Sequence, residues 1–326
     1  MSEAAESTLA SRLPTTHEPE QPAPAVPPLP LTPIVRGPVA PWYRRLGLAD
    51  WLALLSSVIV LWVAASALWP AAFAPYAPTY MNSDAILSAP SIAHPFGTDQ
   101  FGRDVLSLVV FGARQSLVMG VCSVLVSCIV GVALGIATGY FGGTFDLVVM
   151  RVVDVWMSIP NMLLAISLSA ALGPSPFTTV LCVSVTFVPR YARVLRAQTL
   201  GLRTRPFILA ARAAGASHAS ILRRHILPHC IATIVVLATV GIGQSIIIGS
   251  SLSFLGLGVN DERPDWGYLL TQGRSYLTVA WWTVTYPGLA ITALVISANL
   301  IGDALRRWLD PHSVQHLVLA RRARRS

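Results

Sequence analysis

The segment Phe207-Ile-Leu-Ala-Ala-Arg-Ala-Ala-Gly-Ala-Ser217, which continues to Ile226-Leu-Pro228, decides the fold because it forms a polar, arginine-flanked helical hairpin between two long apolar segments. A bilayer offers no water to the backbone of a loop, so this hairpin has to stand outside the membrane. The alanine-rich residues 206–214 favour a helix that starts at a proline. Gly215 stands where a helix end adopts a left-handed conformation, and Ser217 is expected to cap a second helix over 219–227.

The first predicted helix of the hairpin carries small side chains. Ala210, Ala211, Ala213 and Ala214 add little bulk, so a second protein surface can approach the backbone closely. Small residues, a fixed turn and flanking arginines together favour a docking knob for a partner. A surface hairpin without a partner is the alternative.

The composition is that of a membrane protein. Of the 326 residues, 54% are hydrophobic and 12% are charged, whereas about 25% of a soluble domain is charged. The apolar residues also occur in blocks that approach the ~20 residues needed to cross a ~30 Å hydrocarbon core. We therefore predict an all-α integral membrane protein with six transmembrane helices.

We place the six spans at residues 50–72, 115–139, 153–173, 177–197, 231–257 and 281–303. Pro160, Pro189 and Pro287 fall inside three of them, and we expect kinks there, because neighbouring helices re-satisfy the backbone groups that a proline frees. The chain then divides into a Pro-rich tail (1–48), a first span with an extracytoplasmic segment (49–111), a five-helix membrane domain that includes the 200–228 loop (112–304) and a basic tail (305–326).

The arginines set the orientation. All 23 basic residues are Arg, and with a cytoplasmic N-terminus 19 of them fall in inside segments and 4 outside. This positive-inside bias predicts that both termini are cytoplasmic. Topology therefore accounts for the net charge of +8 without nucleic acid as a partner. The last arginines of the basic tail, between Arg321 and Arg325, are placed to contact anionic lipid.

Two further features of the composition have structural readings. Residues 1–41 contain ten Pro and no apolar signal-peptide core, which predicts a disordered or polyproline II cytoplasmic tail. Cys122, Cys128, Cys182 and Cys230 form no CxxC pair and lie in or beside apolar segments. We interpret them as small core residues and not as a disulfide framework.

The block His94-Pro-Phe-Gly-Thr-Asp-Gln-Phe-Gly-Arg-Asp-Val-Leu-Ser107 lies outside the membrane, between the first two spans. Its two glycines suit turns, and Thr98 or Asp99 is expected to cap the helix that leads into the second span. Arg103 and Asp104 either pair with groups on a neighbouring subunit or belong to a capped helix without an external contact.

A later group of motifs comprises Ser251-Leu-Ser-Phe-Leu-Gly-Leu-Gly258, Pro264-Asp-Trp-Gly267 and Asn299-Leu-Ile-Gly-Asp-Ala-Leu-Arg306. Trp266, Trp281 and Trp282 suit the belt of aromatic residues at a membrane interface. Asp303 and Arg306 are three residues apart, so they are expected to pair on one face of the last helix.

Together these blocks resemble the second permease subunit of the dipeptide/oligopeptide/nickel class of ABC importers. The outside block, continued by Phe111-Gly-Ala-Arg114, is similar to the family signature HPxGTDxxGRDxLSR…GAR. The later motifs are similar to SLSFLGLG…PxWG…GRxY…PGxAI…NxxGDxLRDxLDP, down to Leu309-Asp310-Pro311. The hairpin resembles the EAA loop of this family. The motifs are ordered and colinear, and they cover roughly residues 42–311.

Two positions depart from the family pattern. Leu209 stands where family members usually carry the Glu of the EAA triplet, and Leu108 stands where the second Arg of the outside signature usually falls. Loss of the Glu removes an acidic contact with an ATPase or with neighbouring arginines. Docking is therefore expected to depend on shape, with weakened or partner-specific coupling as the alternative.

The resemblance implies a type I ABC importer permease fold in the cytoplasmic membrane of a bacterium. This chain would form half of a heterodimeric pore with a paralogous permease, and an extracytoplasmic substrate-binding protein would deliver the cargo. Two cytoplasmic ATPase subunits would hold the coupling helices and bind ATP and Mg²⁺. This chain has no GxxxxGK[ST] motif and no Lys to complete one, so we expect it to be no enzyme and to hold no cofactor or metal itself.

The resemblance also assigns residues and cargo. The implied coupling residues are Leu209, Ala210, Ala211, Arg212, Gly215, Ser217, Ile226 and Pro228. Peptides are the expected cargo, and nickel, haem, glutathione or another small solute are the alternatives.

Four polar residues inside the spans are candidates for the lining of a pore: Asn161, Gln244, Ser245 and Asn299. Polar groups in a membrane helix tend to face the interior of the bundle. Hydrogen bonds between helices would explain the same residues equally well.

Two interpretations from other classes stay open. An intramembrane enzyme would need a nucleophile with a base or a metal site. The chain has no GxSxG or HExxH motif, and Pro228 interrupts the helical spacing of His218, His225 and His229, which no carboxylate joins. A scaffold or receptor subunit that does not transport is the second alternative, and Leu209 is its only support.

Overall fold

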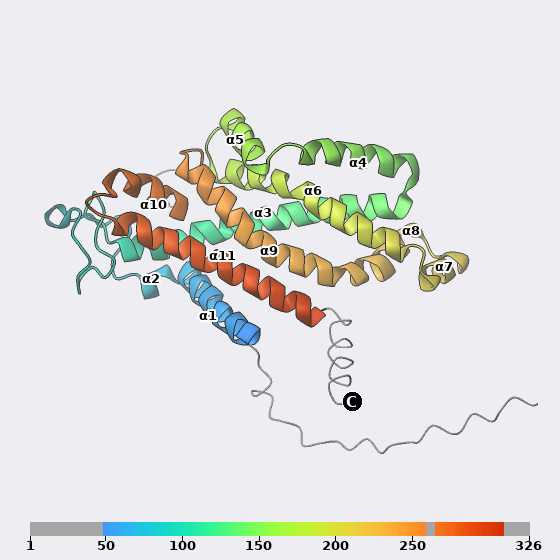
Figure 1. Ribbon diagram of the computed structural model, residues 1–326, viewed down its shortest axis with the longest axis horizontal. Helices are drawn as coiled ribbons and strands as arrows, with labels where there is room; N and C mark the ends of the chain where they lie inside the picture. The colour runs from blue at the N-terminus through green and yellow to red at the C-terminus, as the bar shows by residue number, and fades with distance from the viewer. Residues whose placement is uncertain (1–47, 259–264, 310–326) are drawn as a thin grey trace, which may run out of the picture. The chain divides into compact units, whose positions relative to one another are not determined.

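The computed structural model describes residues 48–258 and 265–309 of the chain (Figure 1). Within these two ranges the secondary structure is helical, and the only extended pairing is an isolated bridge between Thr98 and Asp104. The long helices are α1 (Leu48–Leu68), α3 (Val105–Phe141), α6 (Pro176–Leu202), α9 (Leu227–Phe254) and α11 (Trp282–Leu309). The short elements are α2 (Pro70–Phe73), η2 (Ser83–Ala85), α4 (Gly143–Met157), α5 (Asn161–Leu172), α7 (Pro206–Ala213), α8 (His218–Ile221), the π turn η3 (Leu222–Ile226), α10 (Trp266–Gly273) and η4 (Arg274–Tyr276).

Several predictions fall on residues outside the described ranges. These are the proline-rich tail before Leu48, the basic tail after Leu309 and the start of the Pro264–Gly267 motif.

Four helical segments of the described ranges are long and apolar enough to cross a membrane: Asp50–Leu68, Val105–Phe141, His218–Phe254 and Trp282–Leu309. The pair α4 and α5 meets the same test as one segment, but it is bent by 88° at its break. These findings confirm the prediction of a helical protein with several membrane spans. The fourth predicted span, residues 177–197, corresponds to α6, which is long enough but carries three arginines and is not among the helices that are apolar enough to cross a membrane.

The prediction of one helix over 153–173 is wrong. α4 begins earlier, at Gly143, and ends at Met157, and α5 starts only at Asn161. The break follows from Pro160, because a proline has no N–H to donate and drives the preceding residue out of the helical conformation. The segment is therefore a broken span or a re-entrant loop.

α3 and α6 make the most extensive contact between helices. Gly131, Gly135 and Gly139 recur every four residues on α3 and face α6. A Cβ atom at Gly131 would lie 2.5 Å from the Cβ of Tyr191, and one at Gly139 would lie 2.7 Å from the Cβ of Thr199. Small residues at this spacing allow two membrane helices to approach closely. The two backbones therefore meet along a seam that has no room for side chains.

The remaining long helices are held by similar close contacts. Where α9 crosses α3, Gly249 leaves room for the side chain of Met119, and where α11 crosses α9, Gly302 leaves room for Val240. α1 packs against α3 and α11. Helices that are far apart in the sequence are thereby fixed side by side.

Two ion pairs join α4 to α6. Asp154 accepts a hydrogen bond from Nη2 of Arg193 at 2.5 Å, and Asp146 accepts two hydrogen bonds from Arg196. Arg190, Arg193 and Arg196, assigned from the sequence to the cytoplasmic loop, therefore lie inside a helix. If these three arginines are left out of the count, 16 arginines still fall in the predicted cytoplasmic segments and 4 in the predicted extracytoplasmic segments.

Candidate functional site

The hairpin of α7 and α8 lies at the opposite end of the long helices from α10 (Figure 1). α7 starts at Pro206, whose fixed φ suits the first helical position and whose missing N–H would have no partner there in any case. The helix ends at Ala213, with Ala214 as its C-cap. The predicted helix over 206–214 is therefore confirmed.

The turn of the hairpin is a Schellman motif at Gly215. This residue has a φ of 78°, the left-handed conformation predicted for it. Its N–H donates to the carbonyl of Arg212 at 3.0 Å, and the N–H of Ala216 donates to the carbonyl of Ala211 at 3.0 Å. The last carbonyls of α7 are satisfied in this way, and any residue with a Cβ at 215 would be strained.

The second helix of the hairpin is the start of the fifth span. Ser217 caps α8 as predicted, and its hydroxyl oxygen accepts from the N–H of Ser220 at 3.3 Å. The helix then runs on through η3 into α9, so the prediction that it ends near residue 227 is wrong. The π turn lies directly before Pro228, whose ring clashes with the preceding turn of a regular α-helix and which offers no N–H.

Three isoleucines anchor the hairpin to the long helices. Ile208, Ile221 and Ile226 are completely buried, in one cluster with Tyr140 of α3 and Leu195 of α6. Burying one such side chain contributes about 1.5–3 kcal/mol. Apolar packing on the ends of α3 and α6 therefore sets the position of the hairpin.

A small number of aromatic contacts surround this apolar anchor. The Tyr140 hydroxyl lies 2.8 Å from Nδ1 of His218, and the guanidinium carbon of Arg212 lies 4.8 Å from the centre of the Tyr140 ring. Phe207 stacks on His229 with the ring centres 5.1 Å apart. Both helices of the hairpin are thus tied to the helices from which they emerge.

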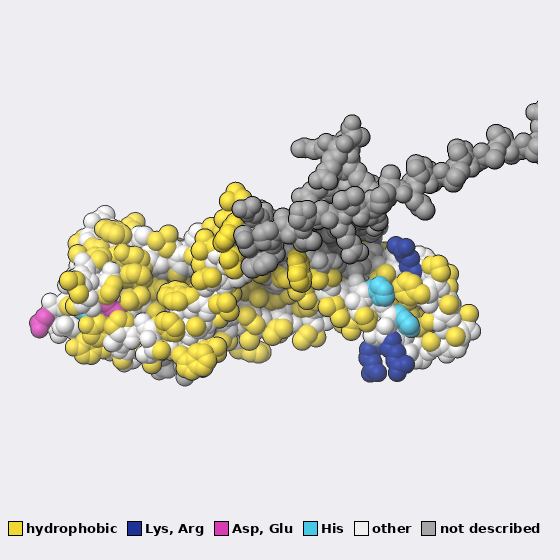
Figure 2. Space-filling view, turned by 90° about the horizontal axis from the view of Figure 1, so that it is seen from below, with side chains coloured by type: hydrophobic (Ala, Val, Ile, Leu, Met, Phe, Trp, Pro, Cys, Tyr) yellow, Lys and Arg dark blue, Asp and Glu magenta, His cyan; other side chains and the backbone are white. Residues whose placement is uncertain are grey.

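The outer face of the hairpin consists of small and apolar side chains. Its exposed members are Phe207, Leu209, Ala210, Ala213 and Ala214. Leu209, the residue that replaces the family Glu, is 51% exposed. Exposed arginines border this face, and Figure 2 shows basic and histidine side chains gathered at this end of the molecule. The bordering arginines are Arg205, Arg212, Arg223 and Arg224.

The residues implied for coupling divide into two groups. Those on the surface are Leu209, Ala210, Arg212, Gly215, Ser217 and Pro228. Ala211 is half-buried and Ile226 is completely buried, and both belong to the apolar anchor. A partner that docks on the hairpin would therefore contact the first group, while Ala211 and Ile226 pack the hairpin against the long helices.

A cleft of about 500 Å³ opens beside the hairpin, between α6, α9 and α11. Its lining includes Gln198 and His229, which are joined by a hydrogen bond of 2.9 Å from Nε2 of Gln198 to the carbonyl of His229. Arg306 lines the cleft from α11, and within the described residues it makes no ion pair with Asp303, so the predicted pair is wrong.

The four polar residues predicted for a pore lining do not form one cluster. Asn161 is exposed at the start of α5, and Asn299 is half-buried on α11. Ser245 is buried, and its hydroxyl has no hydrogen-bond partner among the described residues. Gln244 accepts a hydrogen bond from the guanidinium of Arg190 on α6. Gln244 is thus hydrogen-bonded to Arg190, a charged residue that was not predicted from the sequence to line a pore.

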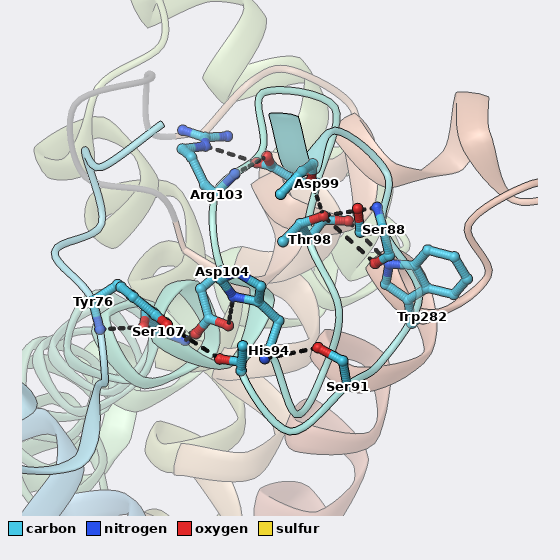
Figure 3. A network of polar contacts seen from close by, with 12 residues as sticks. Tyr76, Ser88, Ser91, His94, Thr98, Asp99, Arg103, Asp104, Ser107 and Trp282 are labelled. Atoms are coloured by element: carbon cyan, nitrogen blue, oxygen red, sulfur yellow. Dashed lines mark hydrogen bonds and ion pairs between the residues drawn. The ribbon is translucent and has the colours of Figure 1, made fainter. Parts of the chain in front are cut away.

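At the other end of the molecule the outside block forms a dense polar network (Figure 3). Asp104 is the N-cap of α3, and its carboxylate accepts from the N–H and the hydroxyl of Ser107, both at 2.8 Å. Its second oxygen lies 3.0 Å from Nδ1 of His94. The prediction that Thr98 or Asp99 caps this helix is therefore wrong.

Asp99 instead closes a turn with Arg103 (Figure 3). It accepts from the N–H of Arg103 at 2.8 Å and from Nε of Arg103 at 2.7 Å. The same guanidinium donates to Oε1 of Gln272 at 3.0 Å. Arg103 and Asp104 are both buried, and each has its partners within this chain. Of the two alternatives predicted for them, these contacts favour a capped helix over pairing with a neighbouring subunit.

Asp265 joins α10 to the end of α9. It is the N-cap of α10, accepting from the N–H of Tyr268 at 2.7 Å and from the hydroxyl of Ser253 at 2.5 Å. Removal from solvent disfavours the charged carboxylate and raises the pKa of Asp265 to about 7. This carboxyl group therefore titrates near neutral pH.

Two of the three tryptophans predicted for a membrane interface belong to the core. Trp266 is 1% exposed, and its Nε1 donates to the carbonyl of Val109 at 2.8 Å. Trp282 is 6% exposed, and its Nε1 donates to the carbonyl of Thr98 at 3.0 Å. Trp281 alone of the three is exposed. The indole N–H groups connect α10 and α11 to α3 and to the outside block.

The described cysteines and histidines form neither a disulfide nor a metal cluster. The four cysteines are free thiols, and Cys182 and Cys230 are fully buried, as expected of small core residues. In residues 48–258 and 265–309, no group of three or more His, Cys, Asp or Glu is placed to hold a metal ion. His229 directs its Nδ1 to the carbonyl of His225 at 2.6 Å.

The arrangement is that of a helical membrane protein with several spans and an exposed helical hairpin at one end. Residues 131–314, more than half of the chain, match the family model described as the inner membrane component of binding-protein-dependent transport systems. The chain belongs to this family.

Curated relatives extend the match over most of the chain. The glutathione transport system permease protein GsiD of Pectobacterium atrosepticum is 40% identical, over 85% of this chain and 92% of the relative. The dipeptide transport system permease protein DppC of Alkalihalophilus pseudofirmus is 41% identical, over 69% and 74%. A putative peptide transport system permease protein of Brucella suis is 44% identical, over 68% and 75%.

Among solved structures, an inward-facing MetNI methionine ABC transporter gives a TM-score of 0.49 at 21% identity, over 62% of this chain and 96% of the matched chain. The assignment rests on the family model and the curated relatives. The chain is a permease component of an ABC importer and a membrane subunit of that system.

Proposed function

We propose that this chain forms half of the pore of an ATP-driven importer in the cytoplasmic membrane of a bacterium. A paralogous permease forms the other half, and an extracytoplasmic substrate-binding protein delivers the cargo. Two cytoplasmic ATPase subunits bind ATP and Mg²⁺, and one of them docks on the hairpin of α7 and α8 while the other docks on the corresponding hairpin of the second permease. The outer face of that hairpin is the observation that carries the proposal.

The hairpin has the properties of a mechanical coupling element. Its outer face is free of bulky polar side chains, so a partner surface can approach α7 closely. Its inner face packs Ile208, Ile221 and Ile226 on α3 and α6. A displacement of α7 is therefore transmitted through apolar contacts to two long helices, as a switch between two pore states requires.

The proposed roles follow from the two groups of hairpin residues. Leu209, Ala210 and Arg212 contact the ATPase, and Gly215 with Ser217 fixes the turn that presents them. Ile226 and Ala211 anchor the hairpin, and Pro228 marks its junction with α9. Because Leu209 is exposed and uncharged, the contact with the ATPase depends on shape and apolar area.

The orientation of the chain supports the same assignment. The exposed arginines around the hairpin suit a cytoplasmic location, and the bias of arginines persists when those inside α6 are set aside. We therefore propose that both termini are cytoplasmic.

Peptides are the proposed cargo. Two of the relatives named above are dipeptide or peptide permeases, and the third is a glutathione permease. Glutathione, nickel, haem or another small solute are the alternatives within the same machinery.

Purification of the tagged chain from its native membranes, with mass spectrometry of the associated proteins, tests the proposal. We expect a second permease and one or two ATPases with a P-loop, and a co-purified binding protein would point to the cargo. An Ala213→Trp variant adds bulk to the outer face of α7, where the residue is exposed, so we expect the ATPases to be lost and the second permease kept.

Ala171→Trp is the matched control, because Ala171 is exposed at the end of α5 and far from the hairpin in sequence and fold. We expect it to retain every partner. Recovery of the wild-type chain without any ATPase in several mild detergents would contradict the proposed function.

A further inference from the structure

Arg190 has an unusual place among the arginines of α6. Arg193 and Arg196 each pair with an aspartate of α4. Arg190 makes no ion pair within the described residues, and its guanidinium donates to the side-chain carbonyl of Gln244 on α9. Its side chain is exposed at the surface of this chain.

The pair lies deep in the membrane part of the fold. Gln244 stands ten residues before the end of α9 at Phe254, about 15 Å along a helix that rises 1.5 Å per residue. Arg190 stands fourteen residues after the start of α6 at Pro176, about 21 Å by the same measure. Counted from these helix ends, Gln244 falls at the midpoint of a ~30 Å hydrocarbon core and Arg190 about 6 Å beyond the midpoint.

A guanidinium at this depth needs more than Gln244. Arg carries five N–H donors, and one amide oxygen satisfies only part of them. Contact with lipid tails is strongly unfavourable for a charged group, so such side chains face a water-filled path or another polar surface. The next residue of α9, Ser245, points to a different face of the helix, and its buried hydroxyl has no partner among the described residues.

We propose that Arg190 and Gln244 form a carboxylate-binding subsite midway along the translocation path, where the Arg190 guanidinium pairs with a carboxylate of the passing cargo. The inference rests on the proposed function, because it requires that α6 and α9 line a path. A carboxylate offers two oxygens in the geometry of the guanidinium fork, so it displaces the neutral amide of Gln244 with a charge-assisted pair. A lipid headgroup is too far from the bilayer centre to be this ligand.

The chemistry of the pair suits passage. Gln244 holds the guanidinium in place when no cargo is present, and it carries no charge that would compete with the cargo. Arg190, unlike Arg193 three residues further along α6, is not paired with a carboxylate among the described residues, so it binds the cargo carboxylate as a single cation and still allows it to leave, which conduction requires.

The test uses the complete importer in proteoliposomes, with both permeases, the ATPases and the binding protein, and labelled dialanine as the probe. Arg190→Gln removes the cation, and Gln244→Glu supplies a fixed carboxylate that competes with the cargo. We expect each variant to lower dialanine uptake at least about tenfold, while ATP hydrolysis stimulated by the binding protein stays within about twofold of the wild type.

Arg151→Gln is the matched control, because Arg151 is an exposed arginine of α4 that makes no ion pair in the described part of the chain. We expect it to transport dialanine at the wild-type rate. Uptake by Arg190→Gln at the rate of this control would overturn the subsite.

Two further outcomes would also overturn it. If Arg190→Gln releases the second permease from the complex, Arg190 belongs to the contact between subunits. If the Arg190→Gln importer does not assemble at all, the Gln244→Glu variant provides the test. Dialanine uptake by Gln244→Glu at the wild-type rate would then contradict the proposed subsite. By contrast, a wild-type complex that shows neither uptake nor stimulated ATP hydrolysis would contradict the proposed function, and the subsite with it.

Discussion

At the hairpin end, Ile208 and Ile226 hold α7 and α8 by apolar burial, whereas at the α10 end Asp99, Asp104 and Asp265 hold loops and helix starts by buried hydrogen bonds. Apolar contacts are not directional, so a hairpin that rests on them can be displaced with the helices beneath it. Buried carboxylates accept hydrogen bonds in one geometry only, and losing a partner leaves a desolvated polar group. The comparison teaches that non-directional apolar burial holds one end and directional hydrogen bonds hold the other.

The two ends also differ in what they leave for other molecules. At the α10 end the polar atoms of Arg103 and Asp104 find partners within the chain. The outer face of α7 has small and apolar side chains, such as Leu209 and Ala213, with no such partners to lose. Binding of a partner to the hairpin therefore breaks few existing interactions.

The largest effect is expected from Asp104→Ala at the polar end. The variant loses the N-cap of α3 and leaves Ser107 and His94 without their acceptor. We expect a loss of about 3–4 kcal/mol in the free energy of unfolding, measured as a lower unfolding temperature in detergent. Asp84→Ala, at an exposed position of η2, is the control and should unfold like the wild type. Equal behaviour of the two variants would refute the role given to the network.

Ile208→Ala should weaken the apolar end by about 2–3 kcal/mol, because it leaves a cavity beneath α7. Because the two ends are held by separate sets of contacts, we expect this loss of stability to be confined to the hairpin end. Hydrogen exchange should increase in 200–228 while the amides around Asp104 stay protected. Faster exchange at both ends would show that the two ends are one cooperative unit.

Asp265→Asn should remove a pH dependence of stability. The carboxyl group has a pKa of about 7 when folded and an ordinary pKa of 3.8, so the folded state binds more protons than the unfolded state between these values. The wild type therefore loses stability as the pH rises from about 4 to 7, by at most about 1.4 kcal/mol per pH unit.

Asn retains the capping of α10, so the variant should be more stable than the wild type at pH 8 and similar to it near pH 4. Unfolding temperatures across this range provide the measurement. A difference between variant and wild type that does not change with pH would show that Asp265 is charged throughout.

Gly215→Ala should destabilise the hairpin by about 1–2 kcal/mol, because residue 215 has a φ of 78°. Gly201→Ala is the control, since Gly201 has no strained φ and a Cβ there meets no atom within 4 Å. Helix propensity predicts that the control is neutral or slightly stabilising. Proteolysis of the hairpin would distinguish the two variants, and equal cleavage would contradict the strain at 215.

Leu209→Glu should change stability least, by less than about 0.5 kcal/mol, because residue 209 is exposed. The substitution tests coupling to the ATPase and not the stability of the fold. Because the proposed contact with the ATPase depends on shape and apolar area, we expect neither Leu209→Glu nor Leu209→Gln to raise the ATP hydrolysis that the binding protein stimulates. A higher rate in Leu209→Glu than in Leu209→Gln would contradict this expectation and indicate that the missing acidic residue weakens coupling.

The hairpin was the more predictable of the two ends. The start at Pro206, the left-handed Gly215 and the cap at Ser217 follow from the conformations that these residues prefer within a few positions of the chain. At the other end, Thr98, Asp99 and Asp104 all suit a helix cap, and local propensity does not choose among them. The choice of Asp104 follows from its contacts with His94 and Ser107 once the loop is folded.

The sequence by itself determined that the protein is a helical membrane protein and that a turn occurs at Gly215, and it predicts that the 200–228 hairpin lies outside the membrane. These properties depend on composition and on backbone preferences within short stretches. The tertiary structure alone decided that Trp266 and Trp282 are buried and that Arg190 meets Gln244, 54 residues along the chain. Such contacts depend on how distant helices cross, because close packing between helices, and not local preference, selects which side chains meet.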